Sequence, residues 1–220
     1  MSGSASFRLV LNVPEYALRF QDEERKNLEE FALSGKRKAK IMEWMKSETS
    51  ILGTDTEKLK YIDHYQIPAH PVDEGAAFED IPVNVRKDWA AIFGNAAIAL
   101  SEVAGNIQPG TSVRVWPHHF DMGSYFPLDQ DGEKAIGAGL AIPDTVEDDF
   151  YFYVYGWNSD SEIPYSGLPL FDAGRWHTDT WKGAALPVMD LSGFSVPDQI
   201  TAVGDFFENG TGYFLEIFKN

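Results

Sequence analysis

The chain has no cysteine among its 220 residues, which excludes disulfide bonds, thiolate zinc sites and cysteine nucleophiles. Several motifs of common enzyme classes are also missing. There is no Gly-x-Gly-x-x-Gly, no phosphate-binding Gly-Lys-Ser/Thr loop, no Gly-x-Ser-x-Gly and no His-Glu-x-x-His. These absences argue against nucleotide-dependent enzymes, serine hydrolases and one large class of zinc proteases.

Basic side chains are scarce, because the chain has only 18 Lys and Arg residues compared with 34 Asp and Glu residues. Most of the imbalance lies in residues 111–220, which hold 5 basic and 17 acidic side chains. Such a surface repels phosphate groups, and nucleic-acid affinity depends largely on basic side chains. A nucleic-acid partner is therefore not expected. The one basic cluster, residues 35–40, is interpreted as a solvated helix face.

Long apolar runs are also absent, because no stretch approaches the roughly 18 apolar residues of a membrane helix. The N-terminus lacks the basic and apolar regions of a signal peptide, so we expect a cytoplasmic protein without membrane contact. A hydrophobic content of 44% predicts an ordered core. We expect a single domain over residues 1–220, with a helical part at about 15–110 and a sheet-rich part at about 111–220.

The first half is predicted to be mainly helical after an initial strand at residues 7–13. Residues 22–46 are rich in Glu, Lys and Leu and predict helix, with a break at Ser34-Gly35. Thr54 to Glu57 forms a capping box that predicts a further helix start. Apolar residues spaced by three and four predict another helix over 85–103.

In the second half the spacing of apolar residues changes from helical to alternating. The expected strands are 112–120, a hairpin of 135–143 with 150–157, and an interrupted extended segment at 175–188. A helix is expected from residue 197, while residues 213–218 fit either helix or strand. Together these predict an α+β fold with N-terminal helices, a central antiparallel sheet and a C-terminal helix.

Two adjacent histidines beside an aspartate mark the main candidate site. Only five histidines occur in the chain, and His118 and His119 lie two or three residues before Asp121. Imidazole titrates near neutrality and is a common metal ligand. If the strand continues past Pro117, His119 and Asp121 point to the same side. We expect one histidine to act as a base or ligand and Asp121 to orient it.

The same spacing recurs at His177 and Asp179. If the two strands are neighbours, His119, Asp121, His177 and Asp179 could bind a divalent transition metal. Two alternatives remain open. The histidines could be structural polar groups, hydrogen-bonded so that they can be partly buried. They could instead line a ligand pocket without a metal.

Aromatic residues predict a ligand-contacting surface near this site. Tyr151, Tyr153, Tyr155 and Trp157 occupy one face of their strand, and the small residues at 137–139 would admit a ring or a ligand. Ligand contacts are expected from Trp116, Tyr151, Tyr153 and Arg175. Arg175 would bind an anionic group of the substrate.

The run Trp116-Pro117-His118-His119-Phe120-Asp121, with Phe150-Tyr151-Phe152-Tyr153 later, resembles a bacterial family of domains of unknown function. Those chains carry Trp-His-x-Phe-Asp on one strand and Phe-Tyr-x-Tyr on a later one. The similarity covers residues 111–157, with Pro117 inserted after the tryptophan. It implies a shared site at His118, Phe120 and Asp121.

The sequence thus predicts an α+β protein with a small-molecule or metal site on a sheet. The alternative is a non-catalytic interaction module that binds a partner, or a second copy in a homodimer, through the aromatic strand face. In that case the histidines are structural.

Overall fold

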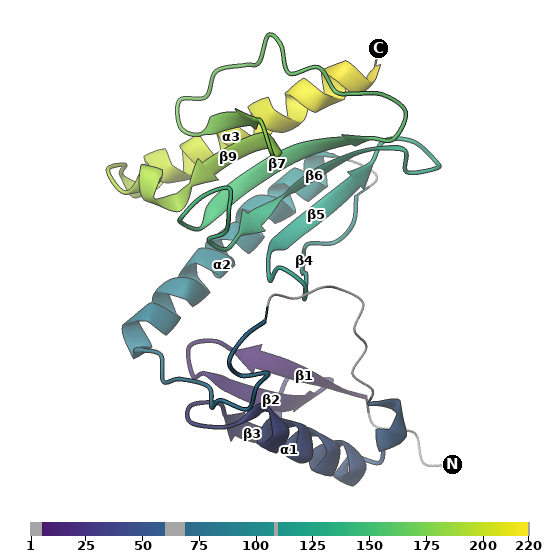
Figure 1. Cartoon of the computed structure of the whole chain (residues 1–220), viewed down its shortest axis with the longest axis vertical. Helices are drawn as coiled ribbons and strands as arrows, with labels where there is room; N and C mark the ends of the chain where they lie inside the picture. Colours follow the sequence, from purple (N-terminus) through teal and green to yellow (C-terminus); the bar gives the residue numbers. More distant parts are fainter. Residues whose placement is uncertain (1–5, 60–68, 108–109, 220) are drawn as a thin grey trace. The chain divides into compact units, whose positions relative to one another are not determined.

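The computed structural model describes residues 6–59, 69–107 and 110–219. It divides the chain into two compact units, Met1–Ile92 and Phe93–Asn220 (Figure 1). The fold is α+β as predicted, but the chain begins with a three-stranded sheet and not with helices. The expected organisation as a single domain stays a prediction.

The N-terminal unit opens with an antiparallel meander of β1 (Phe7–Asn12), β2 (Ala17–Asp22) and β3 (Asn27–Ala32). The first turn is tight, because Tyr16 adopts a left-handed φ of 52° and its N–H bonds to the carbonyl of Val13 at 3.1 Å. The second turn places Arg25 at a φ of 68°, and the Asp22 carboxylate accepts the Lys26 N–H at 2.9 Å. The strand predicted at 7–13 is confirmed.

The helix predicted over residues 22–46 is wrong in its first part. Residues 27–32 form β3, which pairs with β2 so that Leu18 faces Phe31 and Arg19 faces Glu30. The Glu and Leu residues of this segment favour helix on their own, but backbone pairing with β2 outweighs that weak preference. The helix starts only after the break at Gly35, which has a φ of 70°.

That helix is α1 (Lys38–Ile51), and it packs on the meander through aromatic rings. The Trp44 ring lies 5.2 Å from that of Phe20 and 5.1 Å from that of Phe31. Phe20 is 2% exposed and is the largest buried side chain among the described residues of this unit. A small core of aromatic contacts therefore holds α1 to the sheet.

Two further elements come between the two sheets in the sequence. The capping-box segment forms only the short 3-10 helix η1 (Thr56–Lys58), where Asp55 accepts the Glu57 N–H at 3.0 Å. The continuation predicted through Ile62, His64 and Tyr65 lies outside the described residues. Helix α2 (Val83–Asn106) confirms the helix predicted at 85–103.

The C-terminal unit contains a six-stranded antiparallel sheet in the order β4-β5-β6-β7-β9-β8 (Figure 1). Its strands are β4 (Arg114–Val115), β5 (Met122–Pro127), β6 (Lys134–Ala141), β7 (Tyr151–Asn158), β8 (Arg175–Thr178) and β9 (Lys182–Pro187). The predicted hairpin is confirmed as β6 and β7. The predicted extended segment at 175–188 is the β8–β9 hairpin, which is followed by η2 (Val188–Leu191).

The strand predicted at 112–120 is largely wrong. Only Arg114 and Val115 are strand, and the chain then turns, with the Phe120 N–H bonded to the Trp116 carbonyl at 2.8 Å. Pro117 has no N–H for a ladder, and Phe120 has a left-handed φ of 57°. The next strand, β5, had not been predicted from the sequence.

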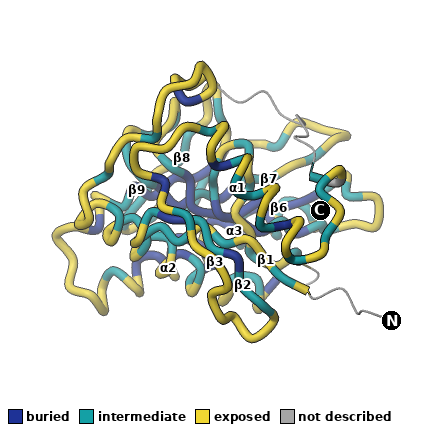
Figure 2. The backbone as a smooth tube through the Cα atoms, turned by 90° about the horizontal axis from the view of Figure 1, so that it is seen from below, coloured by how far each residue is buried: buried dark blue, intermediate teal, exposed yellow. Residues whose placement is uncertain are grey.

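Helix α3 (Val196–Lys219) covers one face of this sheet and includes residues 213–218. On that face the Phe152 ring lies 5.6 Å from Phe207, and Gly210 lets the helix approach Val154 closely. Leu140, Val154 and Leu186 are fully buried, and buried positions concentrate along the central strands (Figure 2). The core of this unit therefore lies between the sheet and α3.

Among the described residues, no helix has both the length and the apolar character that crossing a bilayer requires.

Candidate functional site

The face of the six-stranded sheet opposite α3 carries four tyrosines. Tyr151, Tyr153 and Tyr155 alternate with the buried Phe152 and Val154 along β7, so they point away from α3. Tyr125 on β5 joins them, because it pairs with Gly137, which in turn pairs with Tyr155. We call the face with Tyr125, Tyr151, Tyr153 and Tyr155 the tyrosine face.

Glycines opposite the tyrosines make room for their rings. In register, Gly139 faces Tyr153 and Gly137 faces Tyr155. A Cβ on Gly139 would lie 2.4 Å from the Tyr153 ring, and one on Gly137 would lie 2.2 Å from the Tyr155 ring. The rings therefore lie across β6 in the space that the missing side chains leave, which fixes their positions.

The two sequence segments singled out above meet at this face. The hydroxyl of Tyr153 donates to Oδ2 of Asp121 at 2.6 Å, across 32 positions of sequence. A Cβ on Gly123, two residues after Asp121, would lie 2.6 Å from this hydroxyl. The Tyr153 hydroxyl is thus held between the Asp121 carboxylate and Gly123 of β5.

A second tyrosine–carboxylate pair lies further along β7. The hydroxyl of Tyr151 donates to Oδ2 of Asp144 at 3.0 Å. Burial, and then the adjacent carboxylate, raise the pKa of Tyr151 and of Tyr153 well above the ordinary tyrosine value. Burial also raises the pKa of Tyr155. Tyr151 and Tyr153 therefore keep their hydroxyl protons and donate them to Asp144 and Asp121.

The two histidines of the predicted catalytic group lie in the turn before β5. His118 is half-buried, His119 is exposed, and their ring centroids are 4.8 Å apart. Because the strand ends at Val115, the condition that would place His119 and Asp121 on one strand face is not met. Trp116 contributes its backbone N–H, which bonds to the carbonyl of Asp121 at 2.8 Å. The acid–base roles predicted for His118, His119 and Asp121 stay predictions.

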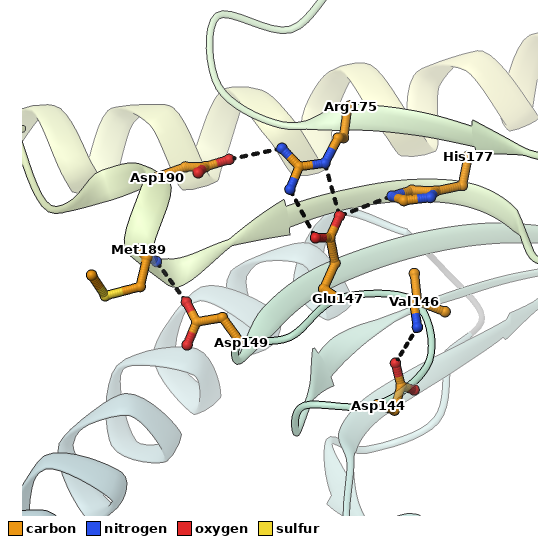
Figure 3. Close-up of polar contacts among 8 residues, drawn as sticks. All are labelled: Asp144, Val146, Glu147, Asp149, Arg175, His177, Met189 and Asp190. Atoms are coloured by element: carbon orange, nitrogen blue, oxygen red, sulfur yellow. Dashed lines mark hydrogen bonds and ion pairs between the residues drawn. The ribbon is translucent and has the colours of Figure 1, made fainter.

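A charged cluster lies at the β8 edge of the sheet, on the same face as the tyrosines, because Arg175 and Tyr153 both pair in register with Ala185. Figure 3 shows its side chains. Arg175 forms a bidentate ion pair with Glu147, in which Nε and Nη2 each donate to a carboxylate oxygen at 2.8 Å. Nε2 of His177 lies 2.9 Å from Oε1 of the same glutamate, and Asp190 bonds to Arg175 at 3.2 Å. We call Glu147, Arg175, His177 and Asp190 the Glu147 cluster.

The Glu147 cluster fixes the connection between β6 and β7. The Arg175 guanidinium, helped by His177, holds the pKa of Glu147 below its ordinary value, although partial burial opposes this. Asp149 anchors the same connection by accepting the Met189 N–H at 2.8 Å, and Asp144 accepts the Val146 N–H at 2.8 Å (Figure 3). Val146 packs against the buried cluster of Ala141, Tyr151 and Ala185, at the Tyr151 end of the tyrosine face.

Of the residues in this cluster, sequence analysis named Arg175 and His177 but missed Glu147. It paired His177 with Asp179, whereas the structure pairs His177 with Glu147, 30 positions earlier. Asp179 is exposed in the bend after β8. Arg175 already binds two carboxylates, which weakens its predicted role in binding an anionic substrate group. One feature of the sequence could have pointed to Glu147. The connection between β6 and β7 is rich in acidic residues and is longer than a tight hairpin needs.

The four predicted metal ligands are not placed together as the coordination of a metal ion requires. Within residues 6–59, 69–107 and 110–219, no group of three or more His, Asp or Glu side chains is placed to hold a metal ion. His119, Asp121, His177 and Asp179 are all among these residues and therefore do not make such a group. Asp121 and His177 instead bond to a tyrosine and to a glutamate.

In comparisons with protein-family models, with curated proteins and with solved structures, nothing matches the chain.

Proposed function

We propose that this protein binds a small organic molecule at the tyrosine face of its six-stranded sheet. The observation that carries the proposal is the hydrogen bond from Tyr153 to Asp121, which joins the two motif segments on the surface of one sheet. Tyr153 and Tyr155 are half-buried, so parts of their rings can be reached by a ligand. Their ring centroids are 6.0 Å apart and their planes are inclined by only 32°.

These surroundings favour a planar ligand that carries a positive charge or hydrogen-bond donors. Tyrosine rings attract cations through their faces, by about 0.5–2 kcal/mol. The carboxylate of Asp121 accepts hydrogen bonds, and the Tyr153 hydroxyl fixes its orientation. The excess of acidic side chains in residues 111–220 adds a negative field that attracts cations and repels anions.

A series of three probes with the same ring tests the proposal. Isothermal titration should show binding of benzamidine, which is planar and cationic. Neutral benzamide should bind at least tenfold more weakly, and the anionic benzoate should not bind. Binding of benzoate as tight as that of benzamidine would refute the proposal, because the acidic face would then have no role.

Two variants locate the binding on the tyrosine face. Asp121→Asn should weaken benzamidine binding by about tenfold, since it removes the charge that faces the ligand. Asp131→Asn removes the same charge from an exposed turn between β5 and β6, and it should leave binding unchanged. Equal weakening by both variants would mean that only the overall charge attracts the probe.

The interaction module predicted as the alternative is supported by Trp157. This side chain lies at the end of the tyrosine row and is 52% exposed, which is high for a large aromatic group. A homodimer through this end of β7 would be detected by light scattering. Trp157→Ala should then convert it to a monomer, whereas Met189→Ala, a change at an apolar residue that is 64% exposed, should not.

A further inference from the structure

One side of α1 carries large apolar side chains that stay open to solvent in the described part of the chain. Lys40, Trp44, Ser47 and Ile51 are spaced by four, three and four positions, so they form one row along the helix. Trp44 is half-buried, and Ile51 is 74% exposed although it is a large aliphatic residue. We call these four residues the α1 row. Their spacing is that of the contact positions in a pair of packed helices.

A hollow of about 410 Å³ lies beside the α1 row, where α1 packs next to β3 (Figure 1). The half-buried rings of Phe31 and Trp44 form its floor, with their planes inclined by 33°. Ser47 also lines the hollow, and its small side chain leaves space above the rings. A water molecule occupies about 30 Å³ in the liquid, so the hollow has room for roughly 14 waters. A large side chain from another molecule can therefore enter it and reach aromatic surface.

The charges that line the hollow change sign along α1. Lys36 and Lys40 lie at the N-terminal end of the helix, and Glu48 lies near its C-terminal end. Glu43, between them, forms an exposed ion pair with Lys40 at 2.7 Å. A second α1 that lies antiparallel brings its glutamate beside the lysines and its lysines beside the glutamate, whereas a parallel one would bring like charges together. This side of α1 is therefore complementary to itself in the antiparallel orientation.

The part of the chain that carries α1 is electrically neutral, whereas the rest is strongly acidic. Residues 1–59 hold 10 basic and 10 acidic side chains, so the whole net charge of −16 belongs to residues 60–220. A large net charge of one sign makes two copies of a chain repel each other. Two copies of this chain can therefore approach each other with the least repulsion at the part that contains α1.

We infer that the α1 row binds the α1 row of a second copy of this chain, with the two helices antiparallel. Trp44 of each copy then lies over Ser47 of the partner subunit, so the indole ring enters the hollow beside a small residue. The stem of Lys40 covers Ile51 of the partner subunit, and its ammonium group reaches Glu48 of the partner subunit. This interface is independent of the ligand binding proposed for the tyrosine face.

The length of α1 limits the strength of this dimer. A helix of 14 residues is about 21 Å long, at 1.5 Å for each residue. Contact along one side of such a helix lies at the small end of the range for specific interfaces. We therefore expect a weak and reversible dimer that forms at high protein concentration.

Sedimentation velocity over a series of protein concentrations tests the interface. The average mass should rise from that of a monomer towards that of a dimer as the concentration increases to about 1 mM. Ile51→Glu should weaken association at least tenfold, and the fold should be retained because this side chain is exposed. Ile98→Glu is the matched control, since Ile98 is a 65% exposed isoleucine on α2, and it should change nothing. A monomer at every concentration, or equal effects of the two variants, would overturn the inference.

An exchange of charges tests the contact between Lys40 and Glu48. Lys40→Glu and Glu48→Lys should each weaken association, because each places like charges side by side in the dimer. The double variant Lys40→Glu/Glu48→Lys re-forms both contacts with reversed signs and should associate more tightly than either single variant. A double variant that associates no better than the single variants would contradict the antiparallel contact.

Distances between spin labels test the orientation of the helices. The chain has no cysteine, so Ala39→Cys and Lys46→Cys each accept one label, and both residues are exposed. They are two turns apart on the side of α1 away from the α1 row. In the antiparallel dimer the two labels at 46 lie level with each other, whereas those at 39 are offset by about 20 Å along the helix axes. The distance should therefore be longer at 39, and equal distances would show parallel helices and overturn the inference.

One further variant separates this interface from the homodimer considered for the end of β7. Trp157→Ala changes an exposed aromatic residue of the six-stranded sheet and should leave the association unchanged. Loss of the dimer in Trp157→Ala, together with an unaffected Ile51→Glu, would assign the interface to β7 and not to α1.

Discussion

The two sheets of this protein are stabilised in different ways. The three-stranded sheet carries charged and polar pairs on its surface, such as Arg19 with Glu30, and relies on a few rings for its core. The six-stranded sheet is tightly packed on both faces, by α3 on one side and by tyrosine rings over glycines on the other. A substitution should therefore be far more costly in the second sheet than in the first.

The largest expected effect is at Gly139 in the second sheet. Gly139→Ala places a Cβ 2.4 Å from both the Met122 carbonyl and the Tyr153 ring, and a backbone atom cannot move aside. We expect a loss of about 3 kcal/mol in the free energy of unfolding, measured by urea denaturation. Gly204→Ala is the control, because a Cβ there meets nothing within 4 Å and lies within α3. This control should gain about 0.5–1 kcal/mol.

An intermediate effect is expected at Glu147, where charge and burial act together. Glu147→Gln removes charge-assisted bonds to Arg175 and His177, and the glutamate is 12% exposed. Since Arg175 is half-exposed and solvent screens it, we expect a loss of only about 1–2 kcal/mol at neutral pH. Asp190→Asn, which leaves the bidentate pair intact, should lose less.

The same variant has a predicted pH dependence. The pKa of Glu147 is lower in the folded protein than in the unfolded chain, where it is about 4.3. Its contribution is therefore fully present above that value and is lost as the pH falls through the lower, folded pKa. The stability difference between the natural protein and Glu147→Gln should shrink below about pH 4. A constant difference down to pH 2 would show that the charge is not its cause.

The smallest effect is expected in the first sheet. Glu30→Gln breaks the ion pair with Arg19, but the glutamate is 48% exposed and its charge is well screened. The expected loss is below about 0.5 kcal/mol by the same denaturation measurement. A loss as large as that of Glu147→Gln would remove the contrast between the two sheets.

Elements with strong periodicity could be predicted from the sequence, and elements fixed by pairing could not. Helix α2 and the β6–β7 hairpin have consistent local patterns over many residues. Strand β3 was missed because its Glu and Leu residues favour helix until β2 pairs with them. The strand predicted at 112–120 was too long, because a phenylalanine gives no indication in the sequence that its backbone adopts a left-handed conformation, as Phe120 does.

The candidate site was predicted in its parts but not in its contacts. Asp121, Tyr153, Arg175 and His177 were named from residue type and spacing alone. The bonds from Tyr153 to Asp121 and from His177 to Glu147 depend on strand order and register, which single-sequence patterns do not specify. Tyrosine rings over glycines were foreseeable, because the small residues at 137–139 indicated close approach by a ring or a ligand.

The order of the six strands has a consequence for folding kinetics. From β4 to β7 every strand pairs with its predecessor, and β8 pairs with β9, so these contacts close short loops. Among the strands that the structure describes, only β7 and β9 pair without being consecutive in the sequence. Because closing longer loops slows folding, docking of the β8–β9 hairpin onto β7 should be the late step. The ion pair between Arg175 and Glu147 should form only in that step.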